Sequence, residues 1–180
     1  MLRWPIRDEI YLRLPEERDV EELLRLIESN RDRLEEWMRW AHSTHTTEDL
    51  LQFVQRARRD FQKPTSMEML IFERREIIGS CALKINEQDS YAEIGYWIGR
   101  AFAGRGIITE CCRALIDYAF DELGLNRVQV RCAAGNTRSA AIAKRLGFKH
   151  EGTRRQALRT GLRRDDEDCY GLLKSDRQQV

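Results

Sequence analysis

Residues 104–109, Gly-Arg-Gly-Ile-Ile-Thr, join a predicted strand to a predicted helix, and the interpretation of the fold depends on them. Apolar residues recur at helical spacing from Ile108 to Ala119, and Gly124 ends the helix. Two glycines before a helix allow the backbone to approach a ligand closely, and the free N–H groups of the first helical turn attract an anion such as a phosphate. The same stretch is also typical of a tight turn that binds nothing.

Two other phosphate-binding patterns fit this stretch poorly. The chain contains no Gly-Lys followed by Ser or Thr, which excludes a Walker A loop. Thr109 stands where the pattern Gly-x-Gly-x-x-Gly requires its third glycine, and this strand–helix unit is not the first in the chain. A nicotinamide or flavin site is therefore disfavoured.

Hydrophobic periodicity on both sides of this stretch predicts alternating strands and helices. Upstream we expect strands at 10–14, 67–72, 77–85 and 91–98, a helix or broken pair of helices at 16–40, and a helix from the capping box at Thr46 to Phe61. Downstream we expect a strand at 127–132, a helix at 136–146, and strands at 148–158 and 168–173 around a charged loop. This order, without repeats or linkers, predicts a single α/β domain spanning residues 1–180.

Composition disfavours several classes of protein. The chain has 31 Lys and Arg against 30 Asp and Glu, so it lacks the basic excess that drives binding to nucleic acid or to a membrane surface. The longest stretch without these residues, 40–47, is far shorter than the ~20 apolar residues of a membrane span. Asp8 and Glu9 interrupt any secretory signal. The 5 cysteines show no Cys-x-x-Cys spacing, which favours a reducing cytoplasm over a disulfide framework or a zinc site.

Four motifs occur in an order that resembles the GCN5-related N-acetyltransferase (GNAT) superfamily. They are Ala-Glu-Ile-Gly-Tyr-Trp-Ile at 92–98, Gly-Arg-Gly at 104–106, Asn-Thr-Arg-Ser-Ala at 136–140 and Leu-Gly-Phe-Lys-His-Glu-Gly at 146–152. Near the N-terminus, a further motif resembles the RimL and RimJ branch, which acetylates the N-termini of ribosomal proteins: Asn30, Arg31, Leu34, Trp37, Met38 and Trp40. The resemblance implies an α/β fold of the α+β kind, with a mixed, mostly antiparallel sheet of about seven strands, about four flanking helices and a splayed central strand pair.

The resemblance also implies acetyl-CoA as the co-substrate, and no metal. The diphosphate would be held by the backbone of Gly104, Arg105, Gly106, Ile107, Ile108 and Thr109. The pantetheine arm would pair with the free strand edge at Trp97 and Ile98, and Asn136 would lie beside it. The family loop begins with Gln or Arg where this chain has Ala101. That difference removes one side-chain contact but leaves the backbone cradle.

For catalysis, the family glutamate that takes the proton of the amine falls on Glu93. An alternative is that Glu93 is a surface strand residue paired with Lys or Arg. The tyrosine that many members place seven residues after the Asn is Ala143 here. Ser139 instead matches the serine that the RimL-like branch places near the departing thiolate, although serine in a first helical turn is also typical of a cap. A backbone N–H near Ile98 would meet the oxyanion.

Two further groups of polar residues have no assigned chemistry. The acidic run at 165–168 predicts a solvated loop or, alternatively, a loop that faces a cationic amine. His42 and His45 lie in a polar segment and are expected at the surface rather than as metal ligands.

The resemblance to the GNAT superfamily implies transfer of an acetyl group from acetyl-CoA to a primary amine, by direct attack in a ternary complex. An α-amine with a pKa of ~7.7–8.0 is neutralised at pH 7 for about 1–1.4 kcal/mol, against ~4–5 kcal/mol for a lysine. A protein N-terminus, such as that of a ribosomal protein, is therefore the first choice of acceptor. The alternatives are a small-molecule amine (a polyamine, an aminoglycoside or an aminoacyl nucleotide) and a non-catalytic CoA-binding module. We expect a cytoplasmic protein without nucleic-acid or membrane partners, and the resemblance suggests a homodimer.

Overall fold

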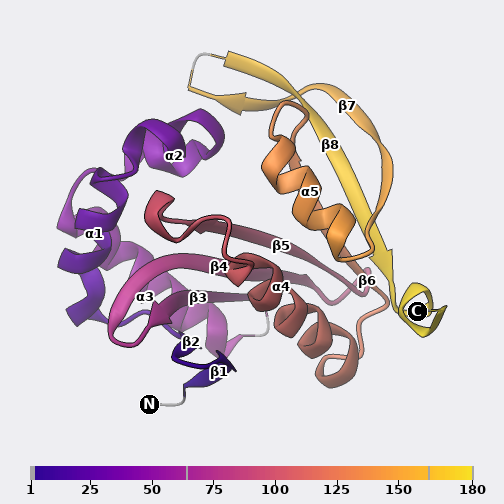
Figure 1. Ribbon diagram of the computed structural model, residues 1–180, viewed down its shortest axis with the longest axis horizontal. Helices are drawn as coiled ribbons and strands as arrows, with labels where there is room; N and C mark the ends of the chain where they lie inside the picture. Colours follow the sequence, from indigo (N-terminus) through magenta and orange to yellow (C-terminus); the bar gives the residue numbers. More distant parts are fainter. Residues whose placement is uncertain (1–2, 64, 162, 180) are drawn as a thin grey trace.

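The computed structural model describes residues 3–63, 65–161 and 163–179, and in them eight strands form one open sheet. The order across the sheet is β1-β2-β3-β4-β5-β6-β8-β7, and all neighbours are antiparallel except β5 and β6. The strands are β1 (Trp4–Arg7), β2 (Ile10–Arg13), β3 (Ser66–Glu73), β4 (Glu76–Asn86), β5 (Tyr91–Ile98), β6 (Arg127–Ala133), β7 (Lys149–Thr160) and β8 (Arg163–Leu173). The helices are α1 (Val20–Glu28), α2 (Arg31–Trp37), α3 (Thr47–Gln62), α4 (Ile107–Asp117) and α5 (Thr137–Arg145) (Figure 1).

The expected mostly antiparallel α/β architecture is confirmed, with one additional strand and one additional helix. The strand that the sequence did not predict is β1, which pairs with β2 at the edge of the sheet. Pro5 lacks an N–H and is tolerated there because edge strands leave half of their backbone groups unpaired. The predicted segment 16–40 is the broken pair α1 and α2. Asn30 marks the break, where its Nδ2 donates to the carbonyl of Leu26 at 2.8 Å.

The expected charged loop between the last two strands is wrong. β7 continues to Thr160 and β8 begins at Arg163, so residues 165–168 belong to a strand. β8 pairs with β6 only over Glu167–Leu173, and in the described part of the chain its first three residues pair with β7 alone. The outer half of this hairpin leaves the sheet and arches toward α2 (Figure 1). Such an arm has no buried face, so its sequence carries no apolar alternation.

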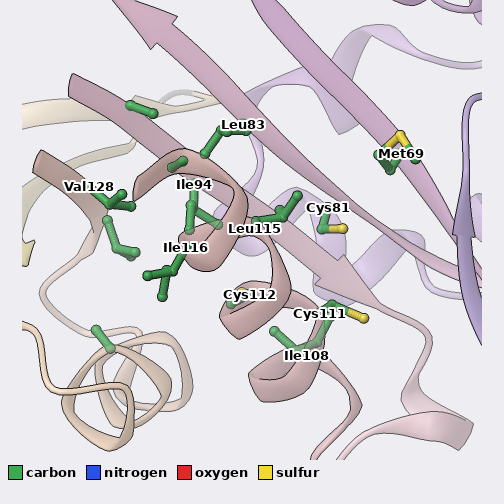
Figure 2. Close-up of a cluster of buried hydrophobic side chains, with 14 of the residues drawn as sticks. Met69, Cys81, Leu83, Ile94, Ile108, Cys111, Cys112, Leu115, Ile116 and Val128 are labelled. Carbon is green, nitrogen blue, oxygen red and sulfur yellow. The ribbon is translucent and has the colours of Figure 1, made fainter. Parts of the chain in front are cut away.

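Two apolar clusters hold helices against the two faces of the sheet. On one face α4 packs on the central strands, as Figure 2 shows for Cys111, Cys112, Leu115 and Ile116 beside Leu83, Ile94 and Val128. On the other face α1 and α3 cover Leu70, Phe72 and Ile77. Four of the cysteines are buried as free thiols, and Cys169 is half-buried.

α3 begins at the predicted capping box. The backbone N–H of Asp49 donates to Thr46 Oγ1 at 3.1 Å, and the N–H of Thr46 donates to Asp49 Oδ2 at 2.9 Å. Among the described residues, no helix combines the length and the apolar composition needed to cross a bilayer.

Candidate active site

β5 and β6 separate in the middle of the sheet. Their parallel pairing covers only Tyr91–Glu93 against Arg127–Gln129, whereas β5 remains paired with β4 as far as Ile98. In the described chain, the edge of residues 94–98 that faces β6 has no strand partner. Backbone N–H and C=O groups on such an edge require hydrogen bonds from elsewhere. The gap therefore suits an extended ligand that carries amide groups.

β5 leads into a turn that ends at the N-terminus of α4. Gly104 and Gly106 both have φ of 79°, in the left-handed region that favours glycine. A Cβ on either glycine would meet no atom within 4 Å, so the outer side of the turn is open. Ile107, Ile108 and Thr109 bury their side chains. What the start of α4 can offer a ligand is therefore its backbone N–H groups and the positive end of the helix dipole.

The side chain of Arg105, in the same turn, is engaged outside it. Its Nη1 lies 3.0 Å from Glu73 Oε2, at the end of β3. A further cation at the start of α4 is Arg145, whose Nη1 donates to Thr109 Oγ1 at 3.3 Å. Arg145 is not among the residues that the sequence predicts for the site. A basic residue in the last turn of a helix, here α5, is ordinarily explained by the helix dipole.

Glu93 lies at the point where β5 and β6 separate, with its side chain 22% exposed. Its Oε2 accepts from Arg131 Nε at 2.7 Å and from Gln129 Nε2 at 3.1 Å. Arg131 is therefore the arginine that the alternative interpretation of Glu93, as a paired strand residue, requires. Oε1 has no partner among the described residues. The hydrogen bond to Glu93 raises the pKa of Arg131, which keeps the guanidinium charged.

Ser139 and Tyr96 connect α5 to β5, and their hydroxyl oxygens are 2.9 Å apart. The cap of α5 comes from Asn136, whose Oδ1 accepts from the backbone N–H of Ser139 at 3.1 Å. The hydroxyl of Ser139 is therefore not used as the cap and reaches β5 instead. Burial raises the pKa of Tyr96, so the phenol stays protonated near neutral pH. The sequence does not single out Tyr96, because its place in the strand alternation is that of a core residue.

A cavity of about 530 Å³ lies on the sheet face that α1 and α3 cover. Its wall combines apolar side chains, among them Trp40 and Trp97 with ring centroids 5.8 Å apart, with polar ones that include Arg56 and Lys84. Glu68 lines the cavity, and in the described chain no Lys, Arg or His nitrogen lies within 4.0 Å of its carboxylate. Burial raises the pKa of Glu68. The cavity extends to Gly95, which shares a strand face with Glu93.

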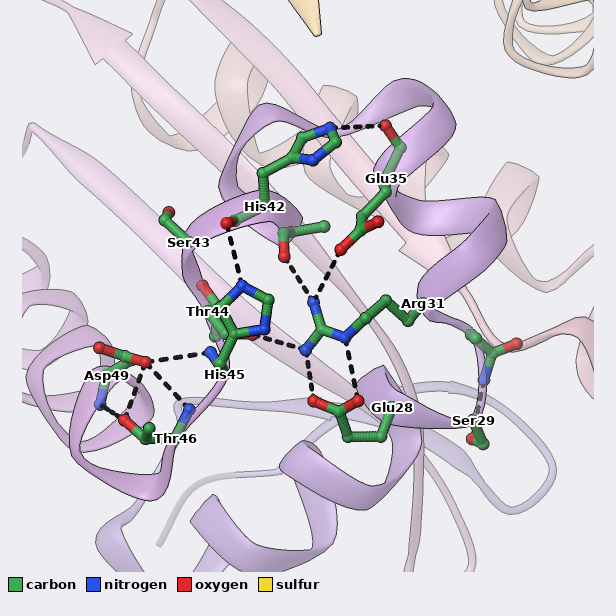
Figure 3. Close-up of polar contacts among 12 residues, drawn as sticks. Glu28, Ser29, Arg31, Glu35, His42, Ser43, Thr44, His45, Thr46 and Asp49 are labelled. Atoms are coloured by element: carbon green, nitrogen blue, oxygen red, sulfur yellow. Dashed lines mark hydrogen bonds and ion pairs between the residues drawn. The ribbon is translucent and has the colours of Figure 1, made fainter. Parts of the chain in front are cut away.

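Arg31 holds the segment between α2 and α3 in place (Figure 3). Its Nη1 donates to the carbonyl of Ala41 at 2.5 Å, and its Nη2 donates to that of Thr44 at 2.7 Å. The same guanidinium pairs with Glu28 and Glu35. This planar group serves four acceptors at once, which a lysine could not do.

Asn30 joins the corner between α1 and α2 to the end of β5. Its Oδ1 accepts from the backbone N–H of Arg100 at 2.8 Å, across 70 positions of sequence. The side chain is buried, so this bond is shielded from water. The Asn-Arg pair of the N-terminal motif thus fixes the helices on one side of the gap relative to β5.

The acidic run on β8 is engaged by neighbouring strands and does not form the solvated loop that was expected. Its partners are Arg163 for Asp165 (2.8 Å), the N–H of Gln156 for Asp166 (2.8 Å), Arg154 for Glu167 (3.2 Å), and Thr153 and His150 for Asp168 (2.5 and 3.2 Å). The Thr153 hydroxyl is the main cause that lowers the pKa of Asp168. Three of the four acidic residues therefore make cross-strand contacts with β7, and Asp165 pairs with Arg163 on its own strand.

His42 and His45 are exposed, as expected. Their Nε2 atoms lie 3.0 Å from the backbone carbonyls of Glu35 and His42, respectively. Across the ranges that the structure describes, no three His, Cys, Asp or Glu side chains are grouped so that they could hold a metal ion.

Comparison with known proteins assigns this arrangement to a family. The family model described as the acetyltransferase (GNAT) domain matches residues 9–149. The chain is a GNAT acetyltransferase. This GNAT chain is 35% identical over 178 residues to YdaF of Bacillus subtilis, a candidate ribosomal N-acetyltransferase, and the match covers 98% of this chain and 97% of YdaF.

Two solved structures extend the likeness of this GNAT domain. The ribosomal-protein α-N-acetyltransferase RimL, in complex with coenzyme A, is 26% identical, with a TM-score of 0.91 over 96% of this chain and 98% of RimL. The microcin self-immunity acetyltransferase MccE, in complex with acetyl-CoA and AMP, is 29% identical, with a TM-score of 0.88 over 93% of this chain and 94% of MccE. The predicted resemblance to RimL-type acetyltransferases is thereby confirmed.

Replacing Arg31 by Lys should destabilise the fold, because a point charge cannot serve two carbonyls and two carboxylates together. We expect the free energy of unfolding to fall by about 1–3 kcal/mol, the range for hydrogen bonds to a charged group. Urea unfolding followed by circular dichroism measures the change. The matched control is Arg74→Lys, because Arg74 also pairs with a glutamate, Glu9, but is 77% exposed and should lose at most about 1 kcal/mol. Equal losses in the two variants would contradict the structural role of Arg31.

Proposed function

We propose that this GNAT domain transfers the acetyl group of acetyl-CoA to the α-amine of a protein N-terminus, with a ribosomal protein as the acceptor. The observation that carries the proposal is the gap between β5 and β6, which connects the open glycine turn before α4 with Glu93. The coenzyme A bound to RimL and the acetyl-CoA bound to MccE support the choice of co-substrate. The α-N-acetyltransferase activity in the name of RimL supports the choice of acceptor.

In this proposal the co-substrate binds mainly to backbone. The turn from Gly104 to Thr109 presents N–H groups to the diphosphate, and the positive end of α4 and the guanidinium of Arg145 add attraction. The amides of pantetheine pair with the free edge of β5 at Trp97 and Ile98. Asn136 uses its Oδ1 for the helix cap, so it would reach the arm through Nδ2.

Glu93 is the proposed general base. Arg131 and Gln129 hold Oε2, which fixes the orientation of the carboxylate and leaves Oε1 to accept the proton, directly or through water. An α-amine is neutralised at pH 7 for only about 1–1.4 kcal/mol, so a weak base is sufficient. A lysine would require ~4–5 kcal/mol, which makes an N-terminus the better match to this site.

The neutral amine attacks the thioester carbonyl, and a backbone N–H near Ile98 stabilises the oxyanion that forms. The C–S bond then breaks and the electron pair leaves with sulfur. Ser139, hydrogen-bonded to Tyr96, is the proposed donor to this thiolate. A thiolate whose conjugate acid has a pKa of ~8.5 needs little assistance, so the contribution of Ser139 should be modest.

A small-molecule amine is the second candidate acceptor, and the 530 Å³ cavity favours it. Its volume lies in the range of small-molecule sites, and its partly apolar wall carries Glu68, which has no ion-pair partner among the described residues. This combination suits an amine with an apolar body. The AMP bound to MccE shows that a GNAT neighbour accommodates a nucleotide. A homodimer and a cytoplasmic location stay predictions from the sequence.

Replacing Gly106 by Ala should weaken acetyl-CoA binding at least tenfold, or about 1.4 kcal/mol, because the new methyl group occupies the open side of the turn. Isothermal titration calorimetry measures the dissociation constant. Gly124→Ala is the matched control: Gly124 has φ of 65°, a Cβ there also meets nothing within 4 Å, and it lies beyond the opposite end of α4. Both variants carry similar backbone strain. Unchanged affinity in a folded Gly106→Ala protein would reject this turn as the cradle.

Replacing Ser139 by Ala should lower kcat with little change in acetyl-CoA affinity, and the loss should shrink as the pH approaches the thiol pKa of ~8.5. If Tyr96 acts through the serine hydroxyl, Tyr96→Phe should cause a smaller loss that disappears in the double variant. Release of free CoA from pH 6 to 9 measures each rate. A wild-type rate for Ser139→Ala at every pH would leave the hydroxyl with a structural role only.

Replacing Glu93 by Gln should lower kcat/KM about 10²-fold near pH 6.5, and the deficit should fade above pH ~7.7 as the neutral α-amine becomes abundant. Gln retains an acceptor for Arg131. The control is Glu151→Gln, because Glu151, on the edge strand β7, also pairs with an arginine, Arg127 at 2.6 Å. A full wild-type rate across pH 6–9.5 would rule out Glu93 as the base.

The same assay identifies the acceptor when it uses a peptide with a free N-terminus and a twin whose N-terminus is blocked and whose lysine is retained. We expect only the free peptide to release CoA. Equal rates for the two peptides would contradict the α-amine proposal, and activity confined to small apolar amines would favour the second candidate.

A further inference from the structure

A second cavity, of about 430 Å³, lies between α2, the segment just after β5 and the N-terminal end of α5 with the residues before it. Its lining includes three arginines from these three segments: Arg33, Arg100 and Arg138. The same cavity contains two carboxylates, those of Asp32 and Glu36, so the charges do not cancel. Side chains that are distant in the sequence thus form a cavity with an excess of positive charge.

The cations of this cavity are unequally paired. Arg100 binds Asp32 at 2.8 Å. In the described parts of the chain, neither Arg33 nor Arg138 has a carboxylate oxygen within 4.0 Å. Nη1 of Arg33 is shielded from solvent and has no hydrogen-bond acceptor. A buried donor without a partner is costly, and a small rotation of the guanidinium toward an anion in the cavity would supply the missing acceptor.

The pKa of Arg33 reports the same imbalance. Burial is the main cause that lowers it, and the positive charges of Arg138 and Arg100 lower it further. The carboxylates of Asp32 and Glu36 oppose this effect without cancelling it. The positive charge of Arg33 is therefore destabilised where it stands, and a ligand of opposite charge would relieve it.

The position of the cavity separates it from the proposed diphosphate cradle. None of residues 104–109 is in its lining. α2 contributes Arg33 and Trp37, and it packs through Leu34 into the cluster on the opposite face of the sheet from α4. The cavity lies beyond the C-terminal ends of β5 and β6, where the gap opens. Its lining also includes Asn136, which is proposed to lie beside the pantetheine arm, so the cavity adjoins the reacting end of the co-substrate and not its diphosphate.

We propose that this cavity binds a carboxylate near the N-terminus of the acceptor, so that the enzyme selects proteins with an acidic residue close to the amine. The inference rests on the proposed peptide acceptor, because carboxylates are the anions that an unmodified polypeptide carries. Arginine can form two parallel hydrogen bonds with a carboxylate, and two arginines without a carboxylate partner in one cavity match such a group in charge.

The test uses peptides with a free N-terminus that carry Asp or Asn at position 2, 3 or 4. We expect the wild-type enzyme to prefer Asp at one of these positions by about tenfold in kcat/KM, which corresponds to 1.4 kcal/mol. In the Arg33→Gln, Arg138→Gln double variant, the preference should fall below about twofold, while the dissociation constant of acetyl-CoA stays unchanged. The control is the Arg59→Gln, Arg75→Gln double variant, which removes two exposed arginines outside the cavity; its change of charge is the same, and it should keep the preference.

The inference is wrong if the wild-type protein shows no preference for Asp or if the preference survives in the double variant. It is also wrong if the double variant binds acetyl-CoA more weakly, because that result would place a CoA phosphate in the cavity. Calorimetric binding of the Asp and Asn peptides, measured with CoA present, does not depend on turnover. Selective binding of an Asp peptide that is not acetylated would contradict the proposed function while supporting the cavity, so the two failures are distinguishable. The melting temperature of the double variant checks that it folds. We expect it not to fall, because Arg33 should contribute little to the stability of the fold.

Discussion

β5 and β6 exchange hydrogen bonds over three residues on each strand and then separate, and this interruption shapes the site. A sheet ordinarily satisfies its backbone groups strand by strand, and a break in the middle leaves a row of N–H and C=O groups to be satisfied by something else. The chain tolerates the break because both strands remain paired on their other sides, β5 with β4 and β6 with β8. The cost of the interruption is thus confined to one edge, and that edge becomes a place for a ligand to bind as an extra strand.

The two faces of the sheet bring different chemistry to this gap. α4 and α5 provide glycine backbone, a helix N-terminus and the hydroxyl of Ser139. α1, α2 and α3 provide apolar walls and the charged lining of two cavities. Asn30 and Arg31 fix the helices of the second face by hydrogen bonds to backbone. Because these hydrogen bonds are short and partly buried, they hold the helices of the second face at a fixed distance from β5.

Much of the fold could be predicted from the sequence because it depends on local patterns. Apolar spacing located α3 and α4, the Thr46–Asp49 pair located the start of α3, and the glycines located the turn before α4. β1 was not predicted because a strand of four residues is too short to show a recognisable alternation of apolar and polar residues. The outer halves of β7 and β8 were not predicted because a strand pair outside the core needs no apolar alternation. Their charged residues were therefore interpreted as a loop.

The site was less predictable than the fold because its contacts join distant segments. Glu93 and Ser139 could be named from motifs, but the partners that define their geometry, Arg131 and Tyr96, lie 38 and 43 positions away. Arg33, Arg100 and Arg138 show no spacing that would associate them in the sequence. Such groupings can be recognised only once the order of the strands in the sheet is known, because that order decides which loops and helix ends lie together.

The hairpin of β7 and β8 has one more consequence. Its outer half is tied to the rest of the molecule at its tip, where Arg163 donates to the carbonyl of Glu36 at 3.1 Å and stacks over Trp37 at 5.4 Å. A two-stranded ribbon alone is only marginally stable in water. Local opening of this arm therefore costs much less free energy than unfolding of the core, and its amide hydrogens should exchange with solvent well before those of β4 and β5. The arm contacts α2 through this one tip, so the space between the arm and α2 can widen without disturbing the core.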